Sequence, residues 1–313
     1  MPLRIVFCGT PAFAVPTLRR LIAEPDFQIA GVITQPDRPR GRGRDVSVSA
    51  VKNAALEAGI PVYQPERIKE QAAQEYFQTA APDVVVIIAY GQIIPARLIA
   101  IPRLGWINLH GSLLPKYRGA APIHWAIANG ETRTGLTTMQ IDAGLDTGPM
   151  LLKYETEIGA EETSPELYAR LAEAGGPLMV ETLRGLDTGT ITAIPQDESQ
   201  KSFAPPLKKE DGRIDWSLSA AQIYNRMRGF QPWPGAFTAF RGKTCQVWGK
   251  PANKEAAPGS HGTIQTKNGE ILVSAGHGTS LRLEAVQMEG RKKVAAREFA
   301  NGARLVPGDQ FGN

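Results

Sequence analysis

The chain has 313 residues, of which 42% are hydrophobic, and carries a formal net charge of +4. This length exceeds the size at which single cores usually stop growing, so we expect two modest domains. The chain has no run of about 18 apolar residues, and Met1-Pro2 leads directly into an expected strand, so neither a membrane span nor a signal peptide is predicted. Cys8 and Cys245 are too few and too separated for a disulfide framework or a zinc ribbon, and the four histidines show no ligand spacing. These features predict a protein that stays where it is made, keeps two reduced thiols and binds no metal.

Charge is distributed unevenly along the chain. Residues 205–313 hold 16 Lys and Arg against 9 Asp and Glu, a balance of +7, whereas residues 1–204 hold 19 against 22, a balance of −3. A basic region of this kind favours a polyanionic partner, because neutralised phosphates release counterions. A basic surface that binds nothing in particular is the alternative.

Apolar runs in the first 110 residues predict a sheet with helices between its strands. The expected strands are 3–8, 28–34, 60–63, 84–89 and 106–109, and the expected helices are 15–23, 48–58 and 66–79. This alternation predicts an α/β domain with a doubly wound, mostly parallel, Rossmann-like sheet, in which 84–89 is a central strand covered on both faces. Gly9-Thr10-Pro11-Ala12 lacks the Gly-x-Gly-x-x-Gly pattern, so no nicotinamide cofactor is expected.

An arginine-rich segment follows the second expected strand. Arg38, Arg40, Arg42 and Arg44 fall within seven residues that also contain two glycines and a proline. One interpretation is a solvated, disordered loop. The other is a loop that orders around the end of an RNA, because the planar guanidinium fork suits phosphate.

Asn108 and His110 stand two residues apart at the end of an expected strand. Side chains alternate between the two faces of a strand, so both point the same way, at the edge where open α/β sheets build sites. Asp146 follows on the glycine-rich stretch 141–148. An amide, an imidazole and a carboxylate can together polarise a carbonyl, transfer a proton and fix the imidazole tautomer, which suits acyl transfer. A hydrogen-bonded turn beside an ordinary loop aspartate is the alternative.

The remainder of the chain predicts a second unit. A helical pattern at 162–186 closes the first domain, residues 1–188, and the proline-containing stretch 189–207 is expected to be a linker. A short helix at 220–228 is followed by short strands at 237–240, 244–248, 262–266, 271–274 and 280–286, separated by glycine and proline turns. These strands predict a small β-barrel in residues 208–313. A barrel with a positive face is a common nucleic-acid platform, although barrels host other functions too.

Four stretches of the chain match one known family. They read VFCGTPAFA at 6–14, AYGQIIP at 89–95, NLHGSLLP at 108–115 and PWPGA at 232–236. Through them the chain resembles the folate-dependent formyltransferases over essentially its whole length. The resemblance implies that Asn108, His110 and Asp146 are catalytic and that the barrel is OB-like and binds tRNA. It also implies that 10-formyltetrahydrofolate is the formyl donor and that the α-amino group of initiator methionyl-tRNA is the acceptor.

The same resemblance implies binding residues. In the family, the segment that matches Ser112, Leu113, Leu114 and Pro115 borders the folate site, and the insertion that matches Arg38, Arg40, Arg42 and Arg44 approaches the tRNA acceptor end. Arg42 is our choice for the main contact. Packing roles for Leu113 and Leu114 remain an alternative.

A folate pocket also follows from the residues themselves. A pterin is a flat ring edged by hydrogen-bonding groups, which backbone groups of strand ends and loops can satisfy while apolar side chains enclose the ring. Ile88, Ala89 and Tyr90 at a strand end, and Asp142 on the 141–146 loop, are placed for this role.

The expected mechanism is direct attack of the amine on the formyl group carried by N10 of tetrahydrofolate. Asn108 and His110 are expected to stabilise the oxyanion that develops, and Asp146 to orient His110 and assist proton transfer. Neither a metal nor a covalent enzyme intermediate is required.

Two alternatives to this function remain open. One keeps the same catalysis with a small amine acceptor, such as a phosphoribosyl glycinamide or an amino sugar. The other is a nonenzymatic RNA-binding protein. We expect a monomer located in the cytoplasm or in an organellar compartment with bacterial-type translation.

Overall fold

The structure is a computed structural model that describes residues 1–40, 45–252, 260–267 and 269–312. It divides into two compact units, which are described here separately. The first comprises Met1–Pro122, Arg133–Glu157 and Leu167–Pro205, and the second comprises Ile123–Thr132, Ile158–Glu166 and Pro206–Asn313. Two short segments from the middle of the chain therefore group with the C-terminal residues.

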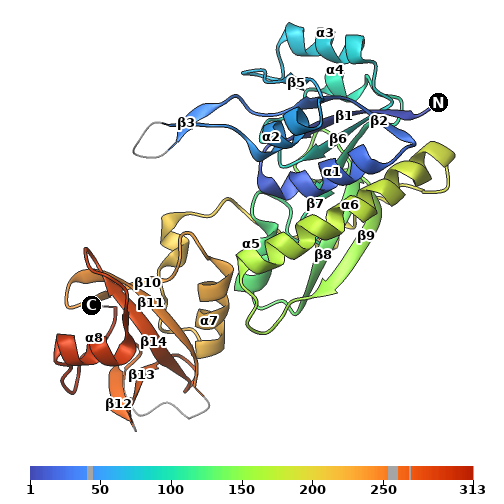
Figure 1. Ribbon diagram of the computed structural model, residues 1–313. Helices are drawn as coiled ribbons and strands as arrows, with labels where there is room; N and C mark the ends of the chain where they lie inside the picture. The colour runs from blue at the N-terminus through green and yellow to red at the C-terminus, as the bar shows by residue number, and fades with distance from the viewer. Residues whose placement is uncertain (41–44, 253–259, 268, 313) are drawn as a thin grey trace. The chain divides into compact units, whose positions relative to one another are not determined.

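The first unit is built on a seven-stranded sheet (Figure 1). In spatial order its strands are β5 (Val62–Tyr63), β2 (Phe27–Ile33), β1 (Leu3–Gly9), β6 (Val84–Ile88), β7 (Trp106–His110), β8 (Arg133–Gln140) and β9 (Met150–Glu157). The first five are parallel, which confirms the doubly wound sheet expected from the apolar runs. The chain winds outward in both directions from β1 and β6, so the strand order reverses between them. Ligands of such sheets bind at this reversal, beyond the carboxyl ends of the strands.

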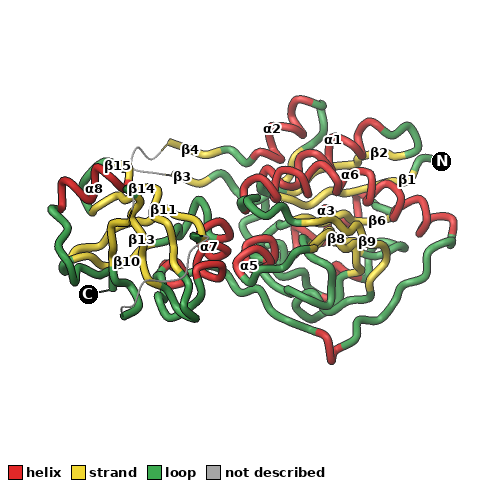
Figure 2. The backbone as a smooth tube through the Cα atoms, turned by 90° about the horizontal axis from the view of Figure 1, so that it is seen from below, coloured by secondary structure: helices red, strands yellow, loops and turns green. Residues whose placement is uncertain are grey.

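Helices cover both faces of this sheet (Figures 1 and 2). They are η1 (Ala12–Ala14), α1 (Val15–Ala23), α2 (Ala50–Glu57), α3 (Gln71–Ala80), α4 (Ala96–Ile99) and, from Leu167 onward, α6 (Ser164–Thr188). Phe77 of α3 and Leu98 of α4 pack with Trp106 on one face. On the other face Gly175 of α6 approaches Leu109 so closely that an added methyl group would lie 2.5 Å from it. Both faces of β6 and β7 are therefore buried, which accounts for their unbroken apolar sequences.

Two features of the first unit add detail to the expectation. The sheet is mostly parallel, as expected, and its last two strands are antiparallel, β8 to β7 and β9 to β8. The arginine-rich segment does not begin as a disordered loop, since β3 (Arg38–Arg40) pairs antiparallel with β4 (Asp45–Ser47). Arg42 and Arg44 lie outside the described residues. Backbone pairing between antiparallel strands can form without an apolar side-chain pattern, so composition alone does not reveal such a ribbon.

The second unit contains an antiparallel sheet, nearly all of α5 (Pro122–Ala128) and two further α-helices. Its elements are η3 (Lys209–Gly212), α7 (Ala220–Gly229), β10 (Phe237–Phe240), β11 (Lys243–Pro251), β12 (Ile264–Lys267), β13 (Glu270–Ser274), β14 (Ser280–Met288), β15 (Val294–Ala295) and α8 (Ala296–Ala303). The strand order is β10-β11-β14-β13-β12, with β15 paired to β14. Phe240, Phe299 and Phe311 form the aromatic centre of its core.

The edges of this sheet are joined by residues 309–312. Phe311 bridges Phe240 beside β10, and Gln310 bridges Thr263 next to β12. The amide of Ile264 also donates to Asp309 O at 2.8 Å. These pairings bring the two edge strands together through one short segment, as a small barrel requires.

None of the helices in the described part of the chain is both long enough and apolar enough to cross a membrane.

Candidate active site

Asn108 and His110 lie at the carboxyl end of β7, in the interior of the sheet. Because side chains alternate along β7, both lie on the same face of the sheet as Trp106, which is the face covered by α3 and α4. Both are buried, with 9% and 6% of their surface exposed. Within the described part of the chain the Asn108 amide has no protein hydrogen-bond partner, yet it is not among the fully buried atoms that lack one, so the amide keeps some accessible surface. An amide left free at a strand end can donate to a ligand.

His110 faces two acceptors. Its Nε2 lies 2.9 Å from the carbonyl oxygen of Tyr117, and its Nδ1 lies 3.6 Å from Asp146 Oδ2. A carbonyl oxygen only accepts, so Nε2 carries a proton in this contact. Nδ1 is the ring nitrogen that faces the carboxylate, at a distance longer than a hydrogen bond. A ring that carries both protons can face both acceptors, which suits a group that moves a proton between substrate atoms and itself.

Asp146 comes from the loop between β8 and β9. β8 ends with Gln140 beside Ile107, so the loop must run along β7 before Asp146 reaches His110. The Asp146 backbone is left-handed, with φ of 52°, and its Oδ2 accepts the amide of Gly119 at 2.8 Å. The loop thus brings together the three residues predicted to be catalytic.

The segment 117–119 contacts both partners of the His–Asp pair through its main chain. Tyr117 provides the carbonyl to His110, and Gly119 provides the amide to Asp146. Gly119 has φ of 120°, and an added Cβ would lie 2.7 Å from Ala204 O, so no side chain fits there. Our sequence reasoning missed both contacts, because main-chain groups leave no residue-type signature.

Ile88, Ala89 and Tyr90 follow β6, next to the end of β7, because Ile87 pairs with Asn108. Ala89 is exposed with a left-handed backbone, whereas Ile88 and the Tyr90 ring are buried. The Tyr90 ring packs in the core, where burial raises the pKa of its phenol. Its carbonyl accepts from Thr10 and Gln35. Only Ala89 of these three offers its surface to a ligand.

Ser112, Leu113, Leu114 and Pro115 directly follow β7. The Ser112 hydroxyl donates to Lys116 O at 2.6 Å, which shapes the turn. Leu114 is 1% exposed and packs against Met139 and Met150, so its side chain is a packing residue. Leu113 and Ser112 are on the same turn, and Leu113 keeps partial exposure.

Asp142 is exposed and forms a turn within its own loop. Its Oδ1 accepts the amide of Gly144 at 2.9 Å and the hydroxyl of Thr147 at 2.7 Å. This carboxylate oxygen is therefore engaged in shaping the loop that carries Asp146.

The arginine-rich segment is described in part. Arg38 is exposed and pairs with Glu66 at 3.2 Å. Arg40 belongs to β3, but its side chain, like all of Arg42 and Arg44, lies outside what the structure describes. The tRNA role expected for these four arginines stays a prediction.

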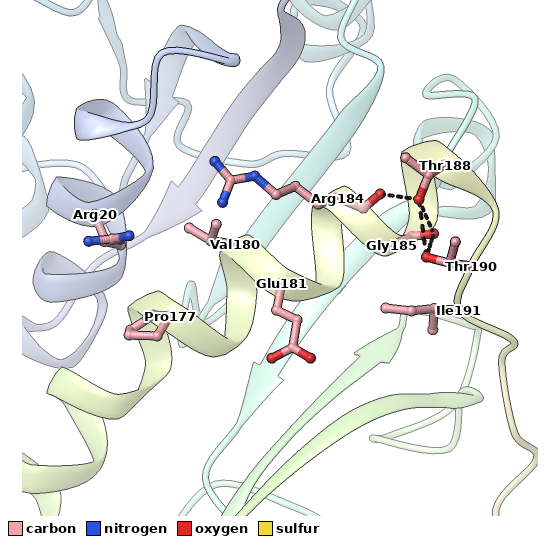
Figure 3. Close-up of a pocket in the computed structure, with 9 residues that line it drawn as sticks. All are labelled: Arg20, Pro177, Val180, Glu181, Arg184, Gly185, Thr188, Thr190 and Ile191. Atoms are coloured by element: carbon pink, nitrogen blue, oxygen red, sulfur yellow. Dashed lines mark hydrogen bonds between the residues drawn. The ribbon is translucent and has the colours of Figure 1, made fainter.

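One hollow on the first unit, about 580 Å³, lies elsewhere (Figure 3). Its lining residues are Arg20, Pro177, Val180, Glu181, Arg184, Gly185, Thr188, Thr190 and Ile191. Arg184 is paired with Glu24 and Asp26, and the hydroxyls of Thr188 and Thr190 lie against carbonyls of α6. None of the predicted site residues lines this hollow, so it is separate from the candidate active site.

The described residues also include candidate metal ligands and two cysteines. Within the described ranges no three His, Cys, Asp or Glu side chains are grouped so that they could hold an ion. Cys8 and Cys245 are free and buried. Burial raises the pKa of both thiols, that of Cys245 to about 12, so neither is a ready nucleophile.

The chain matches two family descriptions. "Formyl transferase" matches residues 3–183, and "Formyl transferase, C-terminal domain" matches residues 206–304. Together they cover most of both units.

Several curated relatives are similar over nearly their whole length. The methionyl-tRNA formyltransferase of Solibacter usitatus is 54% identical over 313 residues, covering 99% of both chains. Those of Koribacter versatilis and Geobacter metallireducens are 52% and 49% identical and cover 98% and 99% of both chains.

Solved structures show the same fold at low identity. The sugar 3N-formyl transferase WlaRD, in the presence of dTDP and 5-N-formyl-THF, has a TM-score of 0.67 at 19% identity, covering 93% of this chain and 100% of its own. The N-formyltransferase of Helicobacter canadensis, in complex with folinic acid and dTDP-3-aminofucose, has a TM-score of 0.66 at 17% identity, covering 91% and 99%.

Proposed function

The chain belongs to the family of methionyl-tRNA formyltransferases, and we propose that it carries out the family's reaction with Asn108, His110 and Asp146 as its catalytic residues. The reaction transfers the formyl group of 10-formyltetrahydrofolate to the α-amino group of initiator methionyl-tRNA. The observation that carries the assignment is the unpartnered Asn108 amide beside a His110–Asp146 pair. This grouping supplies a hydrogen-bond donor and a proton-transfer pair, which formyl transfer needs.

The strand ends of the first unit fit the folate donor. Ala89 is exposed beside the buried end of β6, and the Asn108 amide lies on the neighbouring strand with no described partner. Ala89, Leu113 and the loop at Asp142 would hold the pterin through backbone groups and apolar contacts, and buried Ile88, Tyr90, Ser112, Leu114 and Pro115 would shape the floor beneath it. Bound there, the co-substrate supplies an activated formyl group.

Each of the three residues has its own chemical task. The Asn108 amide donates to the formyl oxygen, where negative charge grows as the amine attacks, and such donors lower the barrier by several kcal/mol. The α-amino group of methionyl-tRNA has an ordinary pKa of about 8, so a useful neutral fraction exists without a strong base. His110, with Asp146 facing its Nδ1, takes up the proton that leaves the attacking nitrogen. The bond between N10 and the formyl carbon then breaks, and N10 gains a proton so that tetrahydrofolate leaves.

The acceptor is bound by basic residues outside this site. The balance of +7 in residues 205–313 favours phosphate binding by this part of the second unit, and Arg38, Arg40, Arg42 and Arg44 add a second basic cluster. Because the acceptor is a tRNA, we place the reaction where translation occurs, in the cytoplasm. One polypeptide contains both the catalytic set and the basic unit, which is compatible with the monomer that we propose.

A formyl-transfer assay that offers competing acceptors tests this function. Purified protein and 10-formyltetrahydrofolate are incubated with methionyl-tRNA, a phosphoribosyl glycinamide or an amino sugar nucleotide, and formylated products are detected by mass. We expect product only from methionyl-tRNA. Faster transfer to a small amine would assign a different acceptor, and no transfer to any would favour an RNA-binding protein without catalysis.

Variants of the site extend the assay. Asn108→Ala and His110→Ala should each lower turnover by at least about 100-fold, because each removes a charge-stabilising or proton-transfer group. Circular dichroism checks that the variants are folded. A folded variant with a nearly normal single-turnover rate would remove that residue from the mechanism.

A further inference from the structure

Arg118 lies between the two main-chain groups that contact the catalytic pair. Tyr117 O accepts from His110 at 2.9 Å, and Gly119 N donates to Asp146 at 2.8 Å. The Arg118 side chain is only 2% exposed. A guanidinium removed from water is costly unless its donors are satisfied, so its partners are part of the site's architecture.

The Arg118 guanidinium has two partners on one segment. Its Nε and Nη2 donate to Gln196 Oε1 at 3.0 and 2.8 Å. Its Nη2 and Nη1 donate to the two carboxylate oxygens of Glu198 at 2.6 and 3.3 Å. Neighbouring backbone pairing strengthens this connection, because Arg118 N donates to Ser202 O and Arg118 O accepts from Ala204 N. The segment that follows residue 195 is thereby fixed to residues 117–119.

Gln196 passes this connection to the catalytic loop. Its Nε2 donates to Asp146 O and to Gly148 O, both at 2.8 Å. The orientation of the amide is set by its neighbours, because a guanidinium only donates and a carbonyl oxygen only accepts. Both hydrogens of the amide and its oxygen are used. One side chain thus holds two carbonyls of the loop and is itself held by Arg118.

The loop needs such a support at Asp146. A left-handed backbone at a non-glycine residue is sparsely populated and persists only where its surroundings fix it. The preceding Leu145 is 64% exposed, so burial of that side chain does not hold the loop. The contact between Asp146 and His110 depends on where this backbone stands.

We propose that Gln196 and Arg118 are positioning residues that hold the Asp146 carboxylate against His110. The proposal deepens the proposed function, because it assigns residues that act through a catalytic residue. Neither side chain contacts the reacting groups. Their effect is on the rate of the chemical step, since a misplacement of about 1 Å can cost roughly 100-fold.

The test uses the full chain with two substitutions at one position. Gln196→Ala removes all four hydrogen bonds of the amide. Gln196→Glu keeps an acceptor for Arg118 but replaces the donor to the loop carbonyls with an oxygen, so the buried charge stays paired. We expect both to lower kcat for methionyl-tRNA by roughly 10- to 100-fold, while the KM for methionyl-tRNA and the Kd for 5-formyltetrahydrofolate change less than about threefold.

A double-mutant cycle separates positioning from a general structural role. In an Asp146→Ala background, Gln196→Ala should have little further effect on kcat, because the side chain that it positions is gone. Gln200→Ala, on the same segment, is the matched control, since the Gln200 amide contacts only Asp197 among the described residues. It should keep the wild-type rate.

Three results would overturn the proposal. They are a wild-type kcat in both Gln196 variants, an equal loss with and without Asp146, and a loss of the same size in Gln200→Ala. The wild-type protein is assayed first with methionyl-tRNA. Absence of transfer there would defeat the proposed function, whereas transfer by the wild type with unaffected Gln196 variants would defeat only the positioning role.

Discussion

Replacing Asp146 with Asn removes one charge from the site and little else. Oδ2 of Asp146 accepts from Gly119 N and lies 3.6 Å from His110 Nδ1. An amide oxygen can still accept from Gly119, and asparagine tolerates the left-handed backbone at φ of 52°. We therefore expect a folded protein whose stability falls by about 1 kcal/mol, the difference between a charged and a neutral acceptor.

The rate should fall much more than the stability. Two unit charges about 4 Å apart interact by about 4 kcal/mol at an effective dielectric constant of 20, which bounds the lost attraction between Asp146 and a protonated His110. Each 1.36 kcal/mol is tenfold in rate, so this bound corresponds to roughly 1000-fold. We expect a loss of about 100- to 1000-fold in the single-turnover rate of methionyl-tRNA formylation.

The companion variant Asp146→Ala separates charge from backbone support. It also removes the acceptor for the Gly119 amide and puts alanine in a left-handed conformation, at a cost of about 1–2 kcal/mol for the backbone alone. Its melting temperature should be lower than that of Asp146→Asn, yet its rate should be similar once it is folded. A rate for Asp146→Asn within threefold of the wild type would refute the electrostatic role.

Three further predictions address other parts of the chain. Gly119→Ala should lose more than about 2 kcal/mol of stability, because its Cβ would meet Ala204 O at 2.7 Å, whereas Gly59→Ala, also at positive φ but in open space, should lose only about 1 kcal/mol; equal losses in thermal melts would contradict the steric cause. Burial lowers the pKa of His124 below its ordinary 6.5, so the unfolded state binds the proton more readily, and the stability that neutral His124 contributes is present above pH 6.5 and lost as pH falls below it. His124→Gln should therefore flatten the fall in melting temperature between pH 7 and pH 5, and an unchanged slope would argue against this. Arg42→Ala should weaken productive use of methionyl-tRNA but spare folate binding, and tRNA affinity should fall with salt at a log-log slope of about −0.7 to −0.9 per neutralised phosphate; weaker folate binding with normal tRNA use would show that the assignment of Arg42 is wrong.

The parts of the fold that were predictable are those with strong local signals. The apolar sequences of β6 and β7 were enough to predict the parallel sheet. They also predicted the strand end that carries Asn108 and His110. β9 was not expected, because most of its outer half is exposed and polar as in an edge strand. The short helix α8 was missed for a related reason, since eight residues give a weak periodicity.

Only the catalytic side chains of the candidate site could be predicted from the sequence, and the contacts that position them could not. Asn108, His110 and Asp146 have chemistry that shows in their residue types, whereas Gln196 stands in a stretch that its prolines mark only as a linker. Its contact with Asp146 spans fifty positions and exists only after folding. The domain boundaries at 188 and 208, and the folate and tRNA residues, stay predictions.

The segment that closes the barrel, residues 309–312, is synthesised after all of the barrel strands. A ribosome releases a chain from its N-terminus, so all the strands of the barrel emerge before the segment that joins β10 to β12. Until that segment arrives, two edge strands have open backbone groups on which another chain could add a strand. The residues that pair in this closure are distant in sequence. The chain therefore loses conformational entropy on closing the loop before most of the stabilising contacts have formed. The nascent second unit is therefore most exposed to misassembly just before residues 309–312 dock, when nearly all of its core residues are already available.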